Sequence, residues 1–334
     1  MRFRDPEAAA LYFRNQPGAA RERLDLAEYG FSLRYSDPAA MRGWCDAALV
    51  GLPAETDAHT AAILHAYAGN AHRIVGEFSS AERLLRVALA RYSADPLVLE
   101  FWASLLHDRR KLKKASAVLS RAAAFRRQKG DPIPLASTLL QSAIVLDLSD
   151  EPDNAASVAH SAIETLANNL PLEKGEELLR TALQNIALYL TDAGRPRAAL
   201  LVLRHSRRLL ATGGYRFQLR MDWLHAQISG ALGDDVGARK TFAAVRERFI
   251  AEGMLHETAL VSLDLARYLF LIPSPLEARA EVSSVGPILS QLGIAEDSRE
   301  FRLLRLILAS AQPALDLLSE LSRLLYAQQR FRKF

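Results

Sequence analysis

The sequence of 334 residues contains one cysteine, Cys45. A single cysteine excludes an intrachain disulfide and a cysteine-based metal site. Such scarcity is typical of proteins in a reducing compartment, so we expect this chain to work in the cytoplasm. Cys45 lies in the largely apolar stretch 44–50, which favours a buried small side chain over a reactive thiol.

Long hydrophobic runs are also missing. The longest stretch with neither charge nor histidine is 132–146, which contains Ser, Thr and Gln. It is shorter than the roughly 20 apolar residues that a membrane-spanning helix needs. The first residues, Met-Arg-Phe-Arg-Asp-Pro, contain no apolar core of a signal peptide. We therefore expect a soluble protein without membrane contact.

Catalytic signatures are absent as well. The chain has no G-x-G-x-x-G, G-x-x-x-x-G-K-[ST], H-E-x-x-H or G-x-S-x-G motif, and His256-Glu257 lacks a second histidine at zinc-binding spacing. His65 and His72 share one face of a predicted helix, but two ligands do not complete a structural zinc site. We expect no catalytic residues, no metal and no cofactor, and thus a protein that is not an enzyme.

Strict alternation of apolar and polar residues, which would indicate strands, is not found. Hydrophobic residues make up 50% of the chain and charged residues 24%, and the abundant Leu, Ala, Arg and Glu favour helices. We predict an all-α fold. A chain of this length is large for one globular core, but a repeat array avoids that limit because each unit packs only on its neighbours.

Helix boundaries are marked by two recurring signals. An aspartate before a proline predicts a helix start, because the carboxylate accepts free N–H groups and proline in the first turn loses no bond. Glycine predicts a helix end. The Asp-Pro pairs are 5–6, 37–38, 95–96 and 131–132, and the terminal glycines are Gly130, Gly194, Gly213, Gly214, Gly233, Gly253 and Gly293.

A small residue recurs at a helix-pair spacing. Ala81, Ala115, Ala155, Ala199 and Ala238 are separated by 34, 40, 44 and 39 residues. A period of this size, carried on helices, predicts an α-solenoid. We expect about seven antiparallel helix pairs, a C-terminal capping pair at about 297–329, and one continuous domain over 1–334 that winds as a right-handed superhelix. The predicted pairs are 20–52, 57–91, 96–128, 134–167, 173–210, 217–251 and 255–292, the last turning near 273–275.

The pair 57–91 resembles the tetratricopeptide repeat (TPR). Gly69, Gly76, Phe78, Ala81 and Ala88 occupy the positions at which that family keeps small residues and a turn aromatic. Small residues allow two helices to approach closely. The resemblance covers about 55–250, although the third pair has Arg110 where glycine is usual. It implies the fold and says little about function.

A second resemblance concerns residues 223–269. This stretch, which includes Leu255-His-Glu-Thr-Ala-Leu-Val-Ser-Leu-Asp-Leu-Ala266, looks like the C-terminal part of uncharacterised bacterial TPR proteins. Some similar proteins carry an N-terminal DNA-binding or zinc-binding regulatory module. The first residues here instead run straight into a predicted helix, 6–14. The chain is then either a free-standing solenoid or a piece of a larger regulator.

The TPR resemblance also implies a concave groove lined by the first helix of each pair. A mixed polar set with one tryptophan suits an extended peptide. The alternative is that these are ordinary solvated or packing positions. The chaperone-tail clamp of the family is not reproduced, because Ala66 stands where a lysine is expected. The implied groove residues are Asn70, Arg73, Glu100, Ser104, His107, Gln184, Arg220, Trp223 and Gln227.

Positive charge is concentrated in two stripes, although the net charge is only +4. Residues 109–129 contain nine basic residues and no acid, which could neutralise several phosphates. The alternative is a solvated helix face, and only Phe125 interleaves the charges, which disfavours base stacking. The candidate polyanion patch is Arg109, Arg110, Lys113, Lys114, Arg121, Arg197, Arg204 and Arg208.

Three functions remain open at this level. The leading hypothesis is a non-enzymatic adaptor or scaffold that binds a protein or peptide segment in the concave groove. The second is the ligand- or peptide-sensing half of a bacterial transcription or signalling regulator. The third is nucleic-acid binding through the basic stripes.

Overall fold

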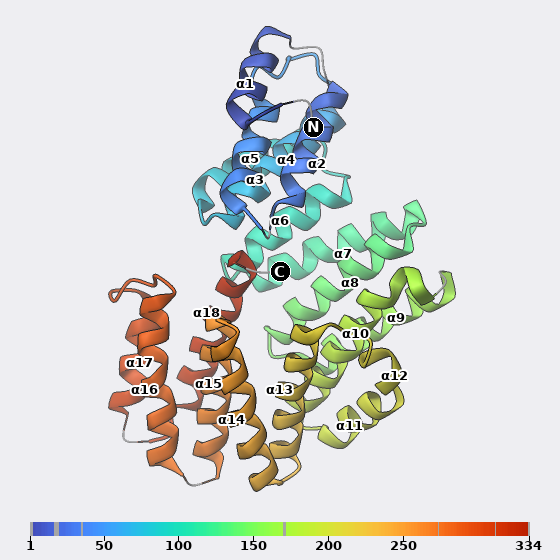
Figure 1. The fold of residues 1–334 in the computed structure, drawn as a ribbon. Coiled ribbons are helices and arrows are strands. Elements are labelled where there is room, and N and C mark those ends of the chain that lie inside the picture. Colours follow the sequence, from blue (N-terminus) through green and yellow to red (C-terminus); the bar gives the residue numbers. More distant parts are fainter. Residues whose placement is uncertain are drawn as a thin grey trace. The chain divides into compact units, whose positions relative to one another are not determined.

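A computed structural model describes residues 3–16, 20–34, 36–169, 172–272, 274–310 and 312–332, without the side chains of 172–174 and 326–332. Every regular element in these ranges is an α-helix, so the all-α prediction is confirmed (Figure 1). The helices are α1 (Pro6–Asn15), α2 (Ala20–Ser32), α3 (Pro38–Leu49), α4 (Ala58–Ile74), α5 (Phe78–Arg91), α6 (Pro96–Asp108), α7 (Leu112–Lys129), α8 (Pro132–Asp147), α9 (Pro152–Asn169), α10 (Leu172–Asp192), α11 (Pro196–His205), α12 (Arg207–Leu210), α13 (Tyr215–Ala231), α14 (Asp235–Ala251), α15 (Leu255–Leu271), α16 (Pro275–Gln291), α17 (Arg299–Ala309) and α18 (Leu315–Arg332).

These helices follow the predicted pairs. The bounds of α2 to α16 match the seven expected units to within a few residues, and α17 and α18 match the expected capping pair. The predicted turn at 273–275 includes Pro273, which lies outside the described residues. Within the described part of the chain, no helix is long and apolar enough to cross a membrane.

All four helix starts predicted from the Asp-Pro pairs are found, and three of the four aspartates cap their helices as expected. Asp5, Asp37 and Asp95 each accept a backbone N–H from the first turn of the helix that follows. The expectation is wrong at Asp131, whose side chain makes no capping bond. There Gly130 ends α7 in a left-handed conformation, and Pro132 starts α8 two residues later without a capping side chain.

The chain divides into two compact units. The N-terminal unit contains α1–α8 and the C-terminal unit α10–α17 with most of α18, and α9 is divided between them. Each unit buries its own hydrophobic cluster, one centred on α3–α6 and the other on α13–α18. The prediction of one continuous superhelical domain stays a prediction.

Within each unit the helices form two layers. In the N-terminal unit α2 contacts α4 and α4 contacts α6; in the C-terminal unit α10 contacts α13 and α13 contacts α15. Among the described residues, the second helices of neighbouring pairs make no comparable contact. A layer whose members lie closer together is the concave side of a helical array. Each unit has its own layers: the inner layer is α2, α4 and α6 in the N-terminal unit and α10, α13 and α15 in the C-terminal unit. The outer layer is α3, α5 and α7 in the N-terminal unit and α11, α14 and α16 in the C-terminal unit.

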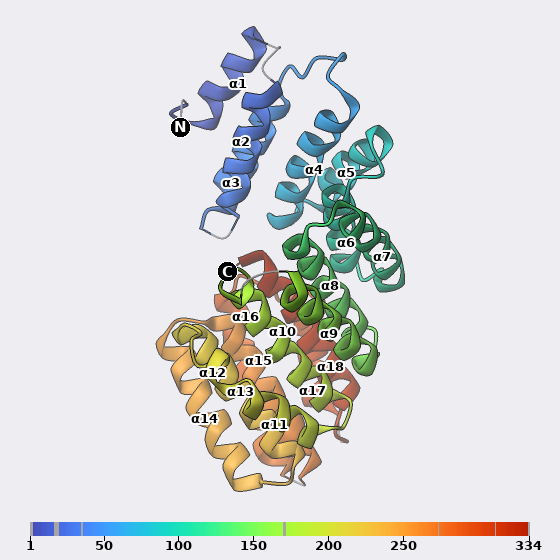
Figure 2. The ribbon, with the colours of Figure 1, turned by 90° about the vertical axis from the view of Figure 1, so that its right-hand side faces the viewer.

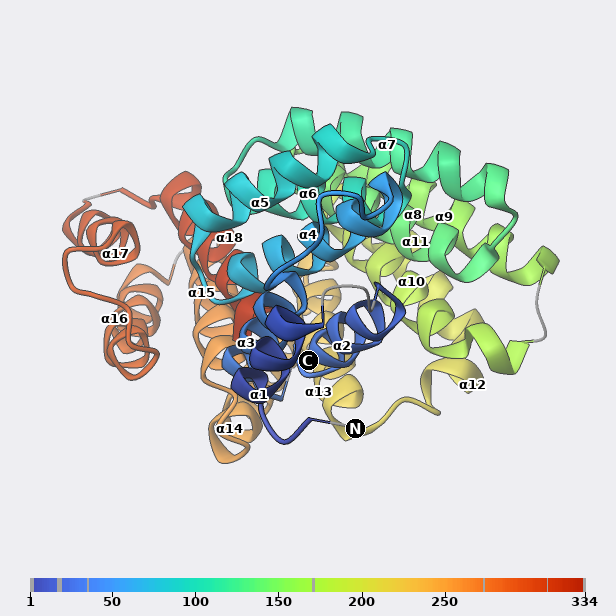
Figure 3. The ribbon, with the colours of Figure 1, turned by 90° about the horizontal axis from the view of Figure 1, so that it is seen from above.

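Figure 2 displays the consecutive pairs α4–α5 and α6–α7 of the N-terminal unit. In the C-terminal unit, α17 packs on α16 beyond the last full pair (Figure 3). The repeating alanines Ala81, Ala115, Ala155, Ala199 and Ala238 have no exposed surface. Their burial agrees with the close helix crossing for which small residues are needed.

Candidate functional site

The nine groove residues inferred from the sequence all lie on inner-layer helices. Five belong to α4 and α6 of the N-terminal unit and four to α10 and α13 of the C-terminal unit. The two groups belong to different units. In the N-terminal group Arg73 and Glu100 are bonded between helices, whereas the C-terminal group borders a cluster of charged side chains.

Asn70, Arg73 and His107 form one buried polar cluster. The Arg73 guanidinium donates to Asn70 Oδ1 at 2.8 Å and to Asp108 Oδ2 at 2.7 Å. The His107 ring lies 3.1 Å from the other Asp108 oxygen. Burial opposes ionisation of Asp108, but the Arg73 charge and the His107 hydrogen bond outweigh it and hold the pKa of Asp108 below its usual value. These side chains connect α4 to α6.

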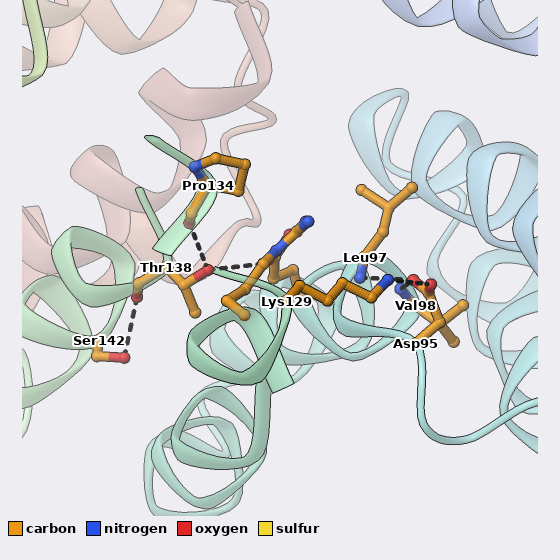
Figure 4. Close-up of polar contacts among 9 residues, drawn as sticks. Asp95, Leu97, Val98, Lys129, Pro134, Thr138 and Ser142 are labelled. Carbon is orange, nitrogen blue, oxygen red and sulfur yellow. Dashed lines mark hydrogen bonds and ion pairs between the residues drawn. The ribbon is translucent and has the colours of Figure 1, made fainter. Parts of the chain in front are cut away.

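Glu100 is also engaged between helices. Arg126 of α7 donates to both Glu100 carboxylate oxygens at 2.9 Å, and Thr138 Oγ1 of α8 lies 2.6 Å from one of them. Side chains of this network, with Pro134 and Ser142, appear in Figure 4. Burial opposes the charge on Arg126, but the Glu100 contacts outweigh it and raise the Arg126 pKa. Arg126 belongs to the basic segment 109–129, so one member of that stripe is neutralised inside the fold.

Asp95 lies close to this network (Figure 4). Its carboxylate caps α6, lies 2.9 Å from His59 Nε2 and lies 3.5 Å from Lys129 Nζ. Burial works against ionisation, yet these partners keep the pKa of Asp95 below its usual value. Lys129, the last basic residue of the segment, is thus also paired.

In the C-terminal unit, Trp223 and Gln227 of α13 point to one carboxylate of α15. Trp223 Nε1 donates to Asp264 Oδ2 at 3.0 Å, and Gln227 Nε2 donates to the same oxygen at 2.6 Å. Trp223 is nearly buried and packs edge-on against Phe249, with ring centroids 6.0 Å apart. Gln227 and Asp264 are half-buried. Two donors therefore fix the direction of an aspartate that retains contact with solvent.

The other two inferred groove residues of the C-terminal unit lie on α13 and α10. Arg220 of α13 lies 3.4 Å from the buried Glu257 of α15. Gln184 of α10 is half-buried. In the N-terminal unit, Ser104 Oγ donates to the Glu100 carbonyl at 3.0 Å, within its own helix.

The structure adds two acidic residues that the sequence analysis missed. Burial raises the pKa of Asp264 to about 6 against the attraction of Arg267, and the negative charge of Asp192 acts in the same direction as burial. Desolvation by the surrounding protein atoms also raises the pKa of Asp192 to about 6, although the residue is exposed at the surface. Arg267 and Arg323 oppose that shift. The sequence signal for Asp264 was its place as the one acid in the apolar stretch 260–266.

Asp264 should make stability depend on pH. An unfolded aspartate titrates near pH 4, so between about pH 4 and 6 the folded state binds a proton that the unfolded state has released. The contribution of this group to the free energy of unfolding is full below pH 4 and falls as pH rises to about 6. Above pH 6 it does not change further. We expect Asp264→Asn to become more stable relative to the wild type over that window, by about 1–2 kcal/mol once partial exposure is allowed for.

Thermal unfolding of the two proteins across that range measures the effect. Asp222→Asn, which removes a surface charge from α13, is the control for loss of a charge. A stability difference between Asp264→Asn and wild type that does not change with pH would contradict the raised pKa.

The basic segment 109–129 separates into paired and exposed charges. Arg109 bonds to Glu82 at 2.9 Å, in addition to the pairs of Arg126 and Lys129. Lys113, Lys114 and Arg121 are exposed. Arg110 occupies a left-handed turn with φ of 59°, where glycine is usual in the family. Pairing therefore makes the net positive charge of this surface smaller than the stripe in the sequence suggests, although Arg109 and Lys129 are themselves exposed.

Arg197, Arg204 and Arg208 are exposed on α11 and α12. Arg207 beside them is also exposed. They belong to the C-terminal unit, whereas the other stripe belongs to the N-terminal unit. Among the described residues, no group of three or more His, Cys, Asp or Glu side chains is arranged to hold a metal ion.

Comparison with protein-family models gives no match, and no curated protein matches the chain. Solved structures do. The apo form of RapI is 12% identical with a TM-score of 0.64, covering 83% of this chain and 99% of RapI. A Rap protein in complex with competence and sporulation factor is 16% identical with a TM-score of 0.64, covering 93% of this chain and 88% of that protein.

Pseudomonas aeruginosa PilF is a third similar structure, at 17% identity and a TM-score of 0.50, covering 69% of this chain and 94% of PilF. At these identities the similarity shows the fold alone. The fold is a TPR-like α-solenoid, as the repeat spacing predicts.

Proposed function

We propose that this chain is a non-enzymatic interaction module that holds a peptide or protein segment on the inner layer of its C-terminal unit. The observation that carries the proposal is the half-buried Asp264 carboxylate, which Trp223 and Gln227 hold in one direction. Asp192 and the exposed Arg267 act on it electrostatically. Such a surface supports an adaptor or scaffold role.

The chemistry of this surface suits an extended backbone. A fixed carboxylate accepts hydrogen bonds from peptide N–H groups or from a cationic group, and a nearby arginine donates to carbonyl or carboxylate oxygens. The half-buried amide of Gln184 on α10 adds a group that can both donate and accept. In the N-terminal unit Arg73 and Glu100 are bonded between helices, and Asn70 is bonded to Arg73. We therefore place the binding surface in the C-terminal unit.

The fold comparison supports a second candidate. A Rap protein with this fold has been seen in complex with competence and sporulation factor. By analogy, this chain would be the sensing part of a bacterial transcription or signalling regulator, which binds its ligand on the same inner surface. Nucleic-acid binding through the exposed Arg197, Arg204 and Arg208 is the third candidate.

The test is affinity capture from a native lysate, with and without nuclease. We expect a stoichiometric, nuclease-resistant protein or peptide with the wild type and about tenfold less with Gln227→Ala/Arg267→Ala. Lys240→Ala, an exposed lysine on outer-layer α14, should capture normally. Trp223→Ala is unsuitable because Trp223 is largely core.

Equal capture by the double variant would place the binding surface elsewhere. Loss of all captured material on nuclease treatment would replace the proposal with the nucleic-acid function. Circular dichroism of each variant confirms that the helices remain intact.

A further inference from the structure

A groove opens on the outer-layer side of the N-terminal unit, and its lining contains none of the inferred groove residues. It lies between α5 and α7 and has a volume of about 310 Å³. Its apolar lining consists of Trp102 and Leu106 from α6 and Ala117 and Val118 from α7. That volume is at the small end of the range for ligand pockets, roughly 300–1,000 Å³, and fits one or two side chains.

The groove exists because neighbouring outer-layer helices do not pack against each other. Among the described residues, α5 and α7 make no contact comparable to that between α4 and α6. Ala117 is exposed at this position, so no long side chain from α7 closes the space. Apolar side chains of α6 are therefore reached from outside.

Positive charge surrounds the apolar floor. Arg86, Lys111 and Lys114 line the groove, and Arg109 lies beside it. The one acid in the lining, Glu82, bonds to Arg86 at 2.7 Å and to Arg109 at 2.9 Å. The Arg86 hydrogen bond, with the charges of Arg109 and Lys111, holds the pKa of Glu82 below its usual value. The groove therefore has four cations and one carboxylate, which is already paired, and its net charge is positive.

The arrangement favours a peptide over a nucleotide base. The Arg86 guanidinium lies over the Trp102 ring, 5.8 Å from its centroid, so a base would have to displace it in order to stack. Leu106, Ala117 and Val118 offer an aliphatic floor. We propose that this groove is a second interaction surface, which binds an acidic peptide segment through an aliphatic side chain in the floor and carboxylates at Lys111 and Lys114.

Selection from a random peptide library on the immobilised full chain tests this site. We expect the enriched peptides to combine Asp or Glu with Leu, Ile or Val. For a synthetic peptide from that set, Lys114→Glu should weaken binding about tenfold. Lys113→Glu, the neighbouring exposed lysine outside the groove, should weaken it by less than about twofold.

A second pair of variants separates the groove from general positive charge. Ala117→Arg fills the floor while adding a cation, and Ala124→Arg adds the same cation to an exposed site on the same helix outside the groove. The peptide should lose affinity for Ala117→Arg only. All four positions are exposed, so the fold should survive each change.

Three results would overturn the site. The first is a selection that enriches no acidic aliphatic peptides. The second is affinity that falls equally for Lys113→Glu and Lys114→Glu. The third is binding of an oligo-dT probe that both arginine variants strengthen while the peptide does not bind, which would make the surface a general polyanion patch. None of these results bears on the inner layer of the C-terminal unit, so the two proposals fail independently.

Discussion

Replacing Arg126 with leucine is expected to lower the free energy of unfolding of the N-terminal unit by about 3–5 kcal/mol. Arg126 makes both of its close bonds to Glu100, and the two side chains are 16% and 10% exposed. Removal of the guanidinium leaves the Glu100 carboxylate buried, and among the described residues Thr138 is then the side chain that still bonds to it. An uncompensated buried charge costs far more than the pair contributes when intact.

Urea denaturation followed by circular dichroism measures this loss. Arg127→Leu, the adjacent exposed arginine of α7, is the matched control and should change stability by about 0.5 kcal/mol or less. The double variant Glu100→Leu/Arg126→Leu should recover most of the stability, because neither charge then remains buried. A loss of less than about 1 kcal/mol in the free energy of unfolding of Arg126→Leu would contradict this prediction. It would show that water reaches the Glu100 carboxylate and that this carboxylate is open to a ligand.

This pair illustrates the limit of inference from sequence. The TPR resemblance placed Glu100 in the groove, and the charge pattern placed Arg126 on a basic stripe. Successive residues on a helix differ in direction by about 100°, so a small error in helix rotation moves a side chain from the groove to the next helix. Which residues of α6, α7 and α8 meet depends on how the three helices pack, and that packing is not encoded in spacing along one helix.

The fold, in contrast, could be predicted from the sequence because its signals are local. Aspartate-proline starts, glycine ends and the recurring alanines act locally, and each has a fixed relation to helix geometry. The role of Asp264 could not be predicted from such local signals. It reads as one acid in an apolar helix, and its role depends on Trp223 and Gln227, about 40 residues earlier in the chain. Only the contact between α13 and α15 brings them together.

Helices α4 and α5 cross closely where Gly69 faces Leu85. A Cβ atom at Gly69 would lie 2.7 Å from Leu85 Cγ and 3.2 Å from the Leu85 backbone nitrogen. Leu85 is fully buried, so it has little room to move. We expect Gly69→Ala to destabilise the N-terminal unit by about 2 kcal/mol, because overpacking outweighs the better helix propensity of alanine.

A double-mutant cycle shows whether the clash is the cause. Leu85→Ala alone should cost about 2–5 kcal/mol through the cavity that it leaves. In that background the nearest opposing atom, Leu85 Cγ, is gone and only the contact with the Leu85 backbone nitrogen at 3.2 Å stays tight. Gly69→Ala should then be neutral or stabilising by up to about 1 kcal/mol. The two substitutions then couple by about 2–3 kcal/mol, as expected for side chains in contact. Additive losses in urea denaturation would mean that Gly69 is required for something other than its distance from Leu85, and the repeat pattern would then mark backbone conformation rather than close helix approach.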